Sequence, residues 1–330
     1  MLPRNRSLAS LAKGLVKAHY HYGLHWLSVP LAPCILIVVQ PGERNVFDQR
    51  PLEHELLEDA VSAFRVPFTR ILSDTVIGHA TTTKQRPLIY RPAHNPEQQW
   101  EVSVVYFRAG YAPEEYSFPR AWEARLHLER SSAIKCPSIL GQLAGSKKVQ
   151  QVLATPSSPH LSRFIRDRGD CDRVRQTFAT ILPLDDSPDG LRARELATDP
   201  VTAQGYVLKP QREGGGNNIY RGAIPTFLRS LPESHWKGYI LMELIEPPAL
   251  SNAIVRNGEV WEGPVIGELG VYGTCLWRQP SSPGEAEGDA VLRNEEAGYL
   301  LRTKPRDSDE GGVAAGFGCM DSCLLIGDEA

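Results

Sequence analysis

The residues best suited to chemistry lie in the stretch 207–220, which reads VLKPQREGGGNNIY. Its first two residues are apolar and lead into Lys209 and a proline, the pattern of a buried strand that ends at a loop. The glycines at 214–216 remove side chains from the next turn, so backbone N–H groups can approach an anion closely. Lys209 adds a positive charge, and Glu213 adds an oxygen ligand of the kind that Mg²⁺ prefers. The stretch therefore predicts a loop that binds a polyphosphate together with a metal ion.

Two other stretches bear on this prediction, because glycine triplets also occur in plain flexible turns. The loop is not a Walker A motif, since no Gly-Lys-Ser/Thr follows the glycines. Residues 238–245 (GYILMELI) read as an apolar strand with one acid, Glu243, which suits a strand edge that holds adenine through its backbone. Residues 302–316 (RTKPRDSDEGGVAAG) supply a second basic pair and a second glycine-rich turn. Two cationic glycine loops that flank an apolar strand favour a nucleotide site.

A second group of polar residues follows a strand predicted at Cys34–Val39. The sequence PGERNVFDQR at 41–50 reads as a strand-to-helix loop, where open α/β sheets place ligand contacts. Capping of the next helix by Asp48 would account for only one of its polar side chains. A later strand ends in FRAGY, where Arg108 and Tyr111 flank a glycine turn. We expect both loops to contact a ligand.

Two lysines, Lys147 and Lys148, follow Gly145 and Ser146 at the start of a predicted helix. Positive charges at that end oppose the helix dipole, and this small cost indicates a bound phosphate. Exposure to solvent is the competing explanation, and this stretch alone slightly favours it.

The elements that must position these residues alternate between helices and strands. Apolar residues at helical spacing predict a first helix at 7–23, which Gly23 would end. Residues 155–200 are rich in Pro, Ser, Asp and Arg and read as a connector without a site. Asn257 and Gly258 predict a hairpin turn between paired strands. The other predicted helices are 52–64, 121–131 and 223–231, and the other predicted strands are 67–76, 101–108, 238–245 and 298–304.

The composition is that of an ordinary globular protein: of 330 residues, 42% are hydrophobic and 23% are charged. The length predicts two domains. A net charge of -3 gives no basic field, so nucleic acid is not an expected partner. No apolar run reaches the roughly 18 residues of a membrane helix, and no secretory signal is recognisable. Six scattered cysteines without a CxxC pair predict a reducing compartment, the cytosol.

Taken in order, the motifs of this chain resemble those of the eukaryotic-type glutathione synthetases, a family of ATP-grasp ligases. The resemblance rests on VLKPQREGGGNN, LMELIEP, GELG, LLRTK and EGGVAAG, with ERNVFDQR, VVYFRAGY, WEARL and QLAGSKKVQQ upstream. It implies an α/β fold with an ATP-grasp nucleotide-binding domain and a three-layer α/β/α substrate-binding domain. The implied divisions are a helix and linker at 1–30, the substrate-binding domain at 31–135 and the ATP-grasp domain at 136–330.

The resemblance also assigns roles to individual residues. For ATP it implies Lys147, Lys209, Pro210, Gln211, Arg212, Glu213, Gly214, Gly215, Gly216, Asn217, Asn218, Tyr220, Met242, Glu243, Leu244, Ile245, Glu268, Lys304 and Glu310. Glu213 would also bind Mg²⁺, and Glu310 stands where the family often has an aspartate. For the peptide γ-glutamylcysteine it implies Glu43, Arg44, Asn45, Gln49, Arg108, Ala109, Gly110, Tyr111, Arg302, Val313 and Ala314. Arg302 would be the catalytic residue, because its planar fork can bind two oxygens of a carboxylate or of the developing oxyanion.

The reaction that the resemblance implies is the ATP-dependent ligation of γ-glutamylcysteine and glycine to glutathione. The cysteinyl carboxylate is activated as an acyl phosphate, the amine of glycine attacks it, and ADP and phosphate are released. Such chemistry depends on positioned phosphates, Mg²⁺ and cations more than on covalent catalysis. The implied cofactors are ATP and Mg²⁺, and the implied assembly is a cytoplasmic homodimer.

The resemblance leaves part of the family's architecture unmatched. Family members carry a long N-terminal portion ahead of the matched segment, which supplies two more Mg²⁺ ligands and contacts to the γ-glutamyl end. No stretch before Cys34 resembles those ligands, so we expect this chain to lack that portion. A second hypothesis follows, in which the chain binds nucleotide without ligase activity and acts through interactions.

Overall fold

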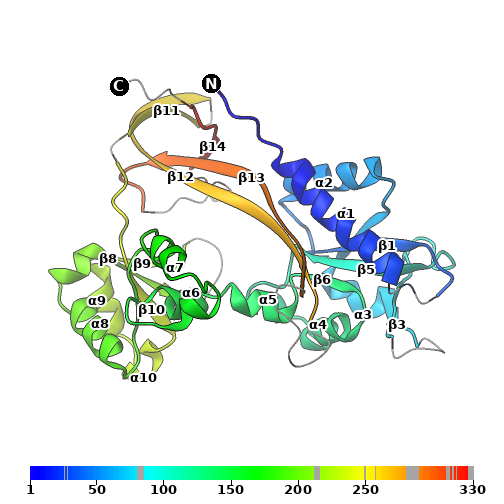
Figure 1. Ribbon diagram of the computed structural model, residues 1–330, viewed down its shortest axis with the longest axis horizontal. Coiled ribbons are helices and arrows are strands. Elements are labelled where there is room, and N and C mark those ends of the chain that lie inside the picture. The colour runs from blue at the N-terminus through cyan, green and yellow to red at the C-terminus, as the bar shows by residue number, and fades with distance from the viewer. Residues whose placement is uncertain are drawn as a thin grey trace. The chain divides into compact units, whose positions relative to one another are not determined.

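The structure, a computed structural model, describes residues 1–25, 27, 29–79, 85–211, 216–248, 250–256, 258–279, 290–309, 313, 316 and 318–325. The chain forms two compact units, whose elements are labelled in Figure 1. Unit 1 consists of Met1–Gly141, Leu269–Leu301 and Asp321–Ala330. Unit 2 consists of Gln142–Glu268 and Arg302–Met320.

Unit 1 contains a mixed six-stranded sheet. Its strands are β1 (Pro33–Val39), β2 (Ala63–Pro67), β3 (Thr75–Ile77), β4 (Leu88–Tyr90), β5 (Trp100–Phe107) and β6 (Ile134–Cys136). The strand order is β2-β1-β5-β4-β3, and β6 also pairs with β5. β1 runs parallel to both of its neighbours, β2 and β5. A central parallel strand is buried on both faces, which explains why β1 is apolar almost throughout.

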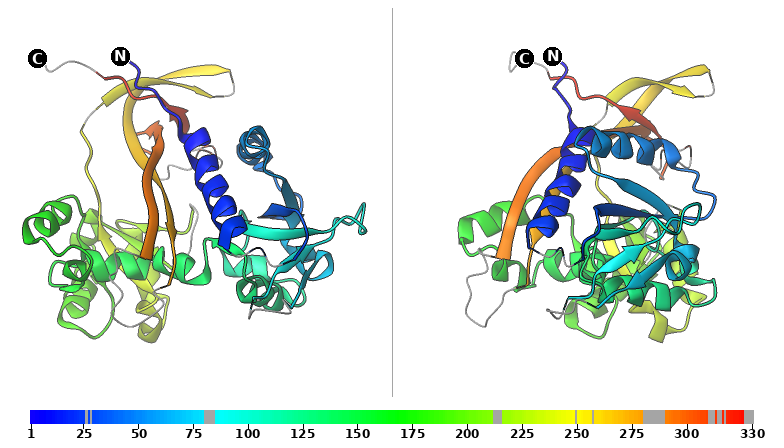
Figure 2. Two further views of the ribbon diagram at one scale, coloured as in Figure 1. Left: turned by 45° about the vertical axis from the view of Figure 1, so that its right-hand side comes forward. Right: turned by 90° about the vertical axis from the view of Figure 1, so that its right-hand side faces the viewer.

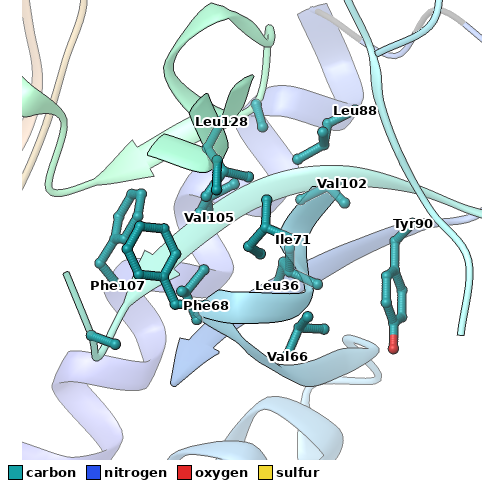
Figure 3. Packing of buried hydrophobic residues seen from close by; sticks show 14 of the residues in the cluster. Leu36, Val66, Phe68, Ile71, Leu88, Tyr90, Val102, Val105, Phe107 and Leu128 are labelled. Atoms are coloured by element: carbon teal, nitrogen blue, oxygen red, sulfur yellow. The ribbon is translucent and has the colours of Figure 1, made fainter. Parts of the chain in front are cut away.

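Helices cover both faces of this sheet. α1 (Ser7–His25) and α2 (Val46–Glu58) pack on one face, and α3 (Ile71–Asp74) and α4 (Ala121–Arg130) pack on the other. Figure 2 shows the dark blue helix α1 alongside the sheet of unit 1. β1 serves both cores, because successive side chains of a strand point to opposite faces. The core under α1 takes Ile35, Ile37 and Val39, and the core under α4 takes Cys34, Leu36 and Val38. Figure 3 shows the core under α4, with side chains that include Leu36, Ile71, Val105 and Leu128.

Buried polar groups also hold α1 on the sheet. Tyr22 donates a hydrogen bond to the carboxylate of Glu101 at 2.7 Å. His19 Nδ1 lies 2.7 Å from Ser103 Oγ, and that hydroxyl donates to the carbonyl of Cys34. The imidazole therefore donates from Nδ1, and burial lowers the pKa of His19, so the ring is neutral at pH 7. The helix predicted at 7–23 is confirmed, except that it continues past Gly23 to His25.

Two other predicted elements of unit 1 are wrong in extent. The helix predicted at 52–64 runs over Val46–Glu58 instead, so Asp48 lies in its first turn and Asn45 is the N-cap residue. The strand predicted at 67–76 is a 3₁₀ turn followed by α3 and β3. Arg70 pairs with Asp74 through two contacts of 2.9 and 2.8 Å, and this (i, i+4) pair stabilises a helical turn.

Unit 2 contains an antiparallel four-stranded sheet of β7 (Ile181–Pro183), β8 (Tyr206–Pro210), β9 (Ile219–Tyr220) and β10 (Tyr239–Glu243). The strand order is β7-β10-β8-β9. α8 (Pro188–Thr198) and α9 (Ala223–Arg229) cover one face through a core that includes Leu208 and Leu241. The segment 155–200, predicted as a connector, thus contributes β7 and α8 to this fold. Unit 2 also contains α6 (Lys147–Ala154), α7 (Arg168–Arg175) and α10 (Glu233–Trp236), whereas α5 (Ile139–Ala144) begins in unit 1 and ends in unit 2.

A further sheet has the strand order β11-β12-β13-β14. Its strands are β11 (Leu250–Arg256), β12 (Glu259–Trp277), β13 (Val291–Pro305) and β14 (Cys319–Asp321). The predicted hairpin is confirmed: β11 and β12 pair antiparallel, and Gly258 has a φ of +83°. Asn257 lies outside the described residues. Within the described part of the chain, no helix combines the length and apolar character needed to cross a membrane.

Candidate functional site

The two loops predicted to contact peptide follow adjacent parallel strands of unit 1. β1 and β5 pair in a register that places Val38 beside Phe107. The amide of Arg108 donates to the carbonyl of Val38 at 2.7 Å. Carboxyl ends of parallel strands meet at one edge of a sheet, which is where open α/β sheets bind ligands. The structure therefore brings the two predicted loops to the same edge.

Glu43 is the carboxylate of this edge, and its Oε1 accepts from the amide of Asn45 at 2.8 Å. Partial burial acts to raise its pKa, but hydrogen bonds from Gln49 and from the amides of Asn45 and Gln40 outweigh that effect. Together with the charge of Arg108 they hold the pKa of Glu43 below its usual range. Glu43 is therefore ionised at neutral pH and suited to a cationic group of a ligand.

Arg108 retains capacity for a ligand. Its Nη1 donates to the hydroxyl of Tyr106 at 3.3 Å, whereas its Nε is buried with no hydrogen-bond partner among the described residues. An unsatisfied guanidinium N–H beside a ligand edge favours a carboxylate, because such charge-assisted bonds are strong. The hydroxyl of Tyr111 donates to the carbonyl of Phe107 at 2.6 Å, so it is engaged within its own loop. Of the remaining predicted residues here, Gln49 and Ala109 are buried, and Arg44 and Asn45 are exposed.

Glu115 holds the loop after β5, and the sequence analysis missed it. Its carboxylate accepts from the amides of Gly110, Tyr111 and Ala112 at 3.0, 2.8 and 3.0 Å. The side chain of Gln40, which follows β1, donates to it at 3.1 Å. A signal was present, since a proline at the first position and a glutamate at the third mark a helical turn. Glu115 thus fixes the predicted peptide loop and links it to the end of β1.

Arg125 supports the same loop from α4 and was also missed. It is only 3% exposed, and its guanidinium lies 4.1 Å from the ring centroid of Phe107. Its Nη1 donates to the hydroxyl of Tyr116 at 3.4 Å, and that hydroxyl donates to the carbonyl of Gly110 at 3.1 Å. Gly110 has a φ of +85°, which most side chains would disfavour. On the sequence, Arg125 reads as an ordinary residue of an amphipathic helix.

Three of the predicted nucleotide residues of unit 2, Lys209, Tyr220 and Met242, share one face of its sheet. Leu208 and Leu241 are direct partners on β8 and β10 and point into the core under α8 and α9. Because side chains alternate along a strand, Lys209 and Met242 lie on the opposite face. Tyr220 lies on that opposite face by the same register. A cation, an aromatic ring and an apolar side chain are thus presented together, as a nucleotide requires.

The N-terminus of α6 approaches the end of β8. Lys147 is the first residue of α6, after the N-cap Ser146. The amide of Lys148 donates to the side chain of Gln211 at 2.9 Å, and its ammonium lies 3.6 Å from the carboxylate of Asp185. The predicted phosphate lysine Lys147 therefore begins a helix bonded to the predicted phosphate loop. Both lysines are partly buried, so plain exposure to solvent does not describe either of them.

A second cationic cluster of unit 2 surrounds Glu268 on β12. Arg302 Nη2 lies 2.9 Å and Lys304 Nζ lies 3.5 Å from its carboxylate. Lys304 is largely buried, and its ammonium also donates to the carbonyl of Asp309 at 3.1 Å. The carboxylate of Asp309 lies 3.7 Å from Arg221, which follows β9. The structure thus joins the predicted residues Glu268, Arg302 and Lys304 into one ion-pair network.

The prediction that 238–245 is a strand edge is wrong, because β10 lies between β7 and β8. The amides of Glu243 and Leu244 donate to the carbonyls of Thr180 and Gly205 at 2.9 and 2.8 Å. The physical reason is that β7, which was not predicted from the sequence, pairs with β10 on the side expected to be free. The amides up to Leu244 are therefore already bonded within the protein, whereas Ile245 is exposed.

Several predicted residues lie outside the described residues: Arg212, Glu213, Gly214, Gly215, Glu310 and Ala314. Of their described neighbours, Gly216 has a φ of +83°, and the side chain of Asn218 donates to the hydroxyl of Tyr220 at 3.1 Å. Pro210 pairs with Tyr239 across the sheet. Asn217 and Val313 are partly buried.

Comparison with known proteins identifies relatives along almost the whole chain. The sequence pattern of the "Eukaryotic glutathione synthase, ATP binding domain" matches residues 1–325. The chain is 40% identical to the glutathione synthetase large chain of Schizosaccharomyces pombe over 293 residues, covering 89% of this chain and 55% of that protein. It is 37% identical to the glutathione synthetase of Homo sapiens over 321 residues, covering 96% of this chain and 61% of that protein. The chain thus spans less than two thirds of the length of either relative.

Among solved structures, the chain is similar to a glutathione synthetase-like effector from Globodera pallida in its apo form. The TM-score is 0.66 at 17% identity, and the match covers 98% of this chain and 63% of that chain. At this identity the likeness concerns the mixed α/β fold alone. The sequence match over residues 1–325 carries the assignment: the chain belongs to the family of the eukaryotic glutathione synthase ATP-binding domain.

Proposed function

We propose that this chain acts in the ATP-dependent ligation of γ-glutamylcysteine and glycine to glutathione, with ATP bound by unit 2. The observation that carries the proposal is the shared sheet face of Lys209, Tyr220 and Met242, next to a helix N-terminus bonded to Gln211. The family of the chain supports the same reading, since its matched domain is an ATP-binding domain. The ATP-grasp architecture is part of the proposal.

In this proposal, cations of unit 2 bind the phosphates. Lys209 and Lys147 offset the phosphate charge, and the amides of the glycine turn add hydrogen bonds. Tyr220 and Met242 pack against the base, whose polar edge meets the backbone from Leu244 to Ile245. Lys304 contacts a phosphate and Glu268 the ribose, which requires the pair between them to loosen.

Bound Mg²⁺ supplies charge neutralisation at the phosphates. Its proposed ligand, Glu213, lies outside the described residues. Among the described residues, no group of three His, Cys, Asp or Glu side chains could hold a metal ion. Mg²⁺ is commonly held by one or two protein carboxylates together with phosphate oxygens and water.

The peptide site of the proposal is the sheet edge of unit 1. Glu43 carries a negative charge suited to the α-amino group of γ-glutamylcysteine, and Arg108 has an N–H left for a carboxylate. Arg302 binds the carboxylate that becomes activated, and its bond to Glu268 fixes its orientation until then. We assign peptide binding to 31–135, nucleotide binding to 136–330 and a helix and linker to 1–30. A cytoplasmic homodimer is the proposed state.

The experiment that tests the proposal is a coupled assay of phosphate release by the chain with Mg·ATP, γ-glutamylcysteine and glycine. The proposal expects release that stops when either glycine or the peptide is omitted. Thermal unfolding with and without Mg·ATP, run in parallel, reports nucleotide binding by itself. Stabilisation by ATP without glycine-dependent release would support the second hypothesis, nucleotide binding without ligation. No stabilisation and no release would refute both.

A further inference from the structure

A cavity of unit 1 shares no lining residue with the sites described above. Its volume is ≈ 450 Å³, and its polar lining consists of Arg86, Arg120, Arg130, His79, His127 and Glu123. That volume lies within the roughly 300–1,000 Å³ of small-molecule sites. The cavity is formed beside β3, α3 and α4, away from the residues that the proposed function uses.

Two guanidinium groups of the cavity lining, those of Arg86 and Arg130, have no carboxylate partner among the described residues. Arg120 Nε and Nη2 both lie 2.7 Å from the same oxygen of Glu123, so the one carboxylate among the described lining residues is already paired. Arg86 and Arg130 have no ion pair within the described part of the chain, and both are exposed. An anion that enters the cavity therefore meets two arginines without displacing a protein carboxylate.

Arg120 is held in a strained backbone conformation at the edge of this cavity. Its φ is +64°, in the left-handed region that residues other than glycine rarely adopt. Glycine would adopt the same conformation without steric cost. Strain that persists at a cavity is a mark of a functional site, because the fold would be more stable without it.

The rest of the lining is apolar or fixed in place. Leu72, Ile77 and Leu126 supply the apolar wall. His127 Nε2 lies 3.0 Å from the hydroxyl of Thr75, and that hydroxyl donates to the carbonyl of Ile71 at 2.7 Å. The imidazole therefore donates from Nε2, and its orientation is set before any ligand arrives.

We propose that this cavity binds a small organic anion with an apolar body. Its phosphate or carboxylate group contacts Arg86 and Arg130, and its apolar body lies against Leu72 and Leu126. Arginine suits both anionic groups, since its planar fork matches their oxygens. The ligand is distinct from the nucleotide and the peptide of the proposed function, so the two proposals stand or fall separately.

The test is calorimetric titration of the whole chain with phenyl phosphate, which carries both features of the ligand. The expected result is saturable binding that weakens about tenfold or more in the double variant Arg86→Gln/Arg130→Gln, as loss of charge-assisted bonds implies. Arg91→Gln, an exposed arginine of the same unit outside the cavity, should bind as the wild type does. Inorganic phosphate, which lacks the apolar body, should bind more weakly than phenyl phosphate.

A second variant separates binding from folding. Arg120→Gly relieves the backbone strain and should leave the melting temperature equal or higher. It also leaves the carboxylate of Glu123 in the lining without its ion-pair partner, and this negative charge should weaken the binding of phenyl phosphate. Absence of saturable binding to the wild type would overturn the proposal. Equal affinity in the double variant, or equal affinity for inorganic phosphate, would overturn it as well.

Discussion

The two proposed binding regions use their carboxylates in opposite ways. In unit 1, Glu115 binds three backbone amides, and Arg108 keeps a buried N–H without a partner in the part of the chain that the structure describes. In unit 2, the carboxylates bind cations instead: Glu268 pairs with Arg302 and Lys304. The first arrangement shapes a loop, whereas the second neutralises the groups that a ligand needs.

This difference predicts two kinds of binding. A ligand of unit 1 adds hydrogen bonds to a loop that is already ordered, which lowers the entropy cost of binding. An anionic ligand of unit 2 competes with internal carboxylates for the same cations. Substitutions should therefore change loop order in unit 1 and ligand affinity in unit 2.

The largest effect is expected for Glu115→Ala in unit 1. Hydrogen bonds to a charged group contribute about 1.5–3 kcal/mol each, so exchange of the amides at 110–112 should accelerate by about 10–100-fold. Hydrogen–deuterium exchange measures this directly. Glu97→Ala, an exposed glutamate of the same unit, serves as the control. Unchanged exchange at 110–112 would show that Glu115 does not order the loop.

Lys209→Met is expected to weaken the binding of Mg·ATP by about one to two decades, since a charge-assisted contact contributes ~1.5–3 kcal/mol. Lys148→Met should have a smaller effect, because the ammonium of Lys148 is paired with Asp185. Calorimetric titration compares the two variants. Equal affinities of the two variants for Mg·ATP would show that Lys209 does not contact the phosphates.

The pH dependence of stability should isolate the buried His19 of unit 1. Burial lowers the pKa of His19 from 6.5 in the folded state, so the unfolded state binds the extra proton first as pH falls. Stability is therefore lost as pH falls below the unfolded pKa, by at most about 1.4 kcal/mol per pH unit. His19→Asn, which keeps a donor for Ser103, should flatten this part of the curve. Urea midpoints measured at a series of pH values test it, and identical pH slopes for both proteins would contradict it.

The smallest effect is expected for Asp185→Asn in unit 2. Removal of the carboxylate frees Lys148 and should strengthen Mg·ATP binding by about two- to fourfold, as exposed pairs contribute only ~0.2–1 kcal/mol. The matched control is Asp186→Asn, because Asp186 pairs with Arg194 instead. Weaker binding of Mg·ATP to Asp185→Asn would mean that internal carboxylates do not compete with the ligand.

Local sequence patterns predicted the elements that their own residues specify without long-range contacts. The apolar run of β1, the hairpin of β11 and β12 and the amphipathic α4 each form where expected. The strand at β7 was missed, because the three residues Ile181–Pro183 are too few to carry a periodic signal. Its pairing with β10 is a long-range contact, and this contact turned an expected edge strand into an internal one.

The residues of the candidate site divide in the same way, into those that local patterns reveal and those that only long-range contacts reveal. Lys209 and Arg108 could be singled out because their residue types at strand ends indicate ligand chemistry by themselves. Arg125 could not, because its role arises from contacts with Phe107 and Tyr116 that only the folded chain brings together. The ion pairs of Glu268 were likewise invisible, since β12 and β13 must first pair.

The central claim, that unit 2 binds the nucleotide on one face of its sheet, is tested most directly by hydrogen–deuterium exchange with and without Mg·ATP. The account predicts slower exchange at the start of α6, along β8 up to Gln211, and at the end of β10. Exchange at 110–112 of unit 1 should not change with nucleotide alone. Protection confined to unit 1, or no protection anywhere in unit 2, would contradict the account.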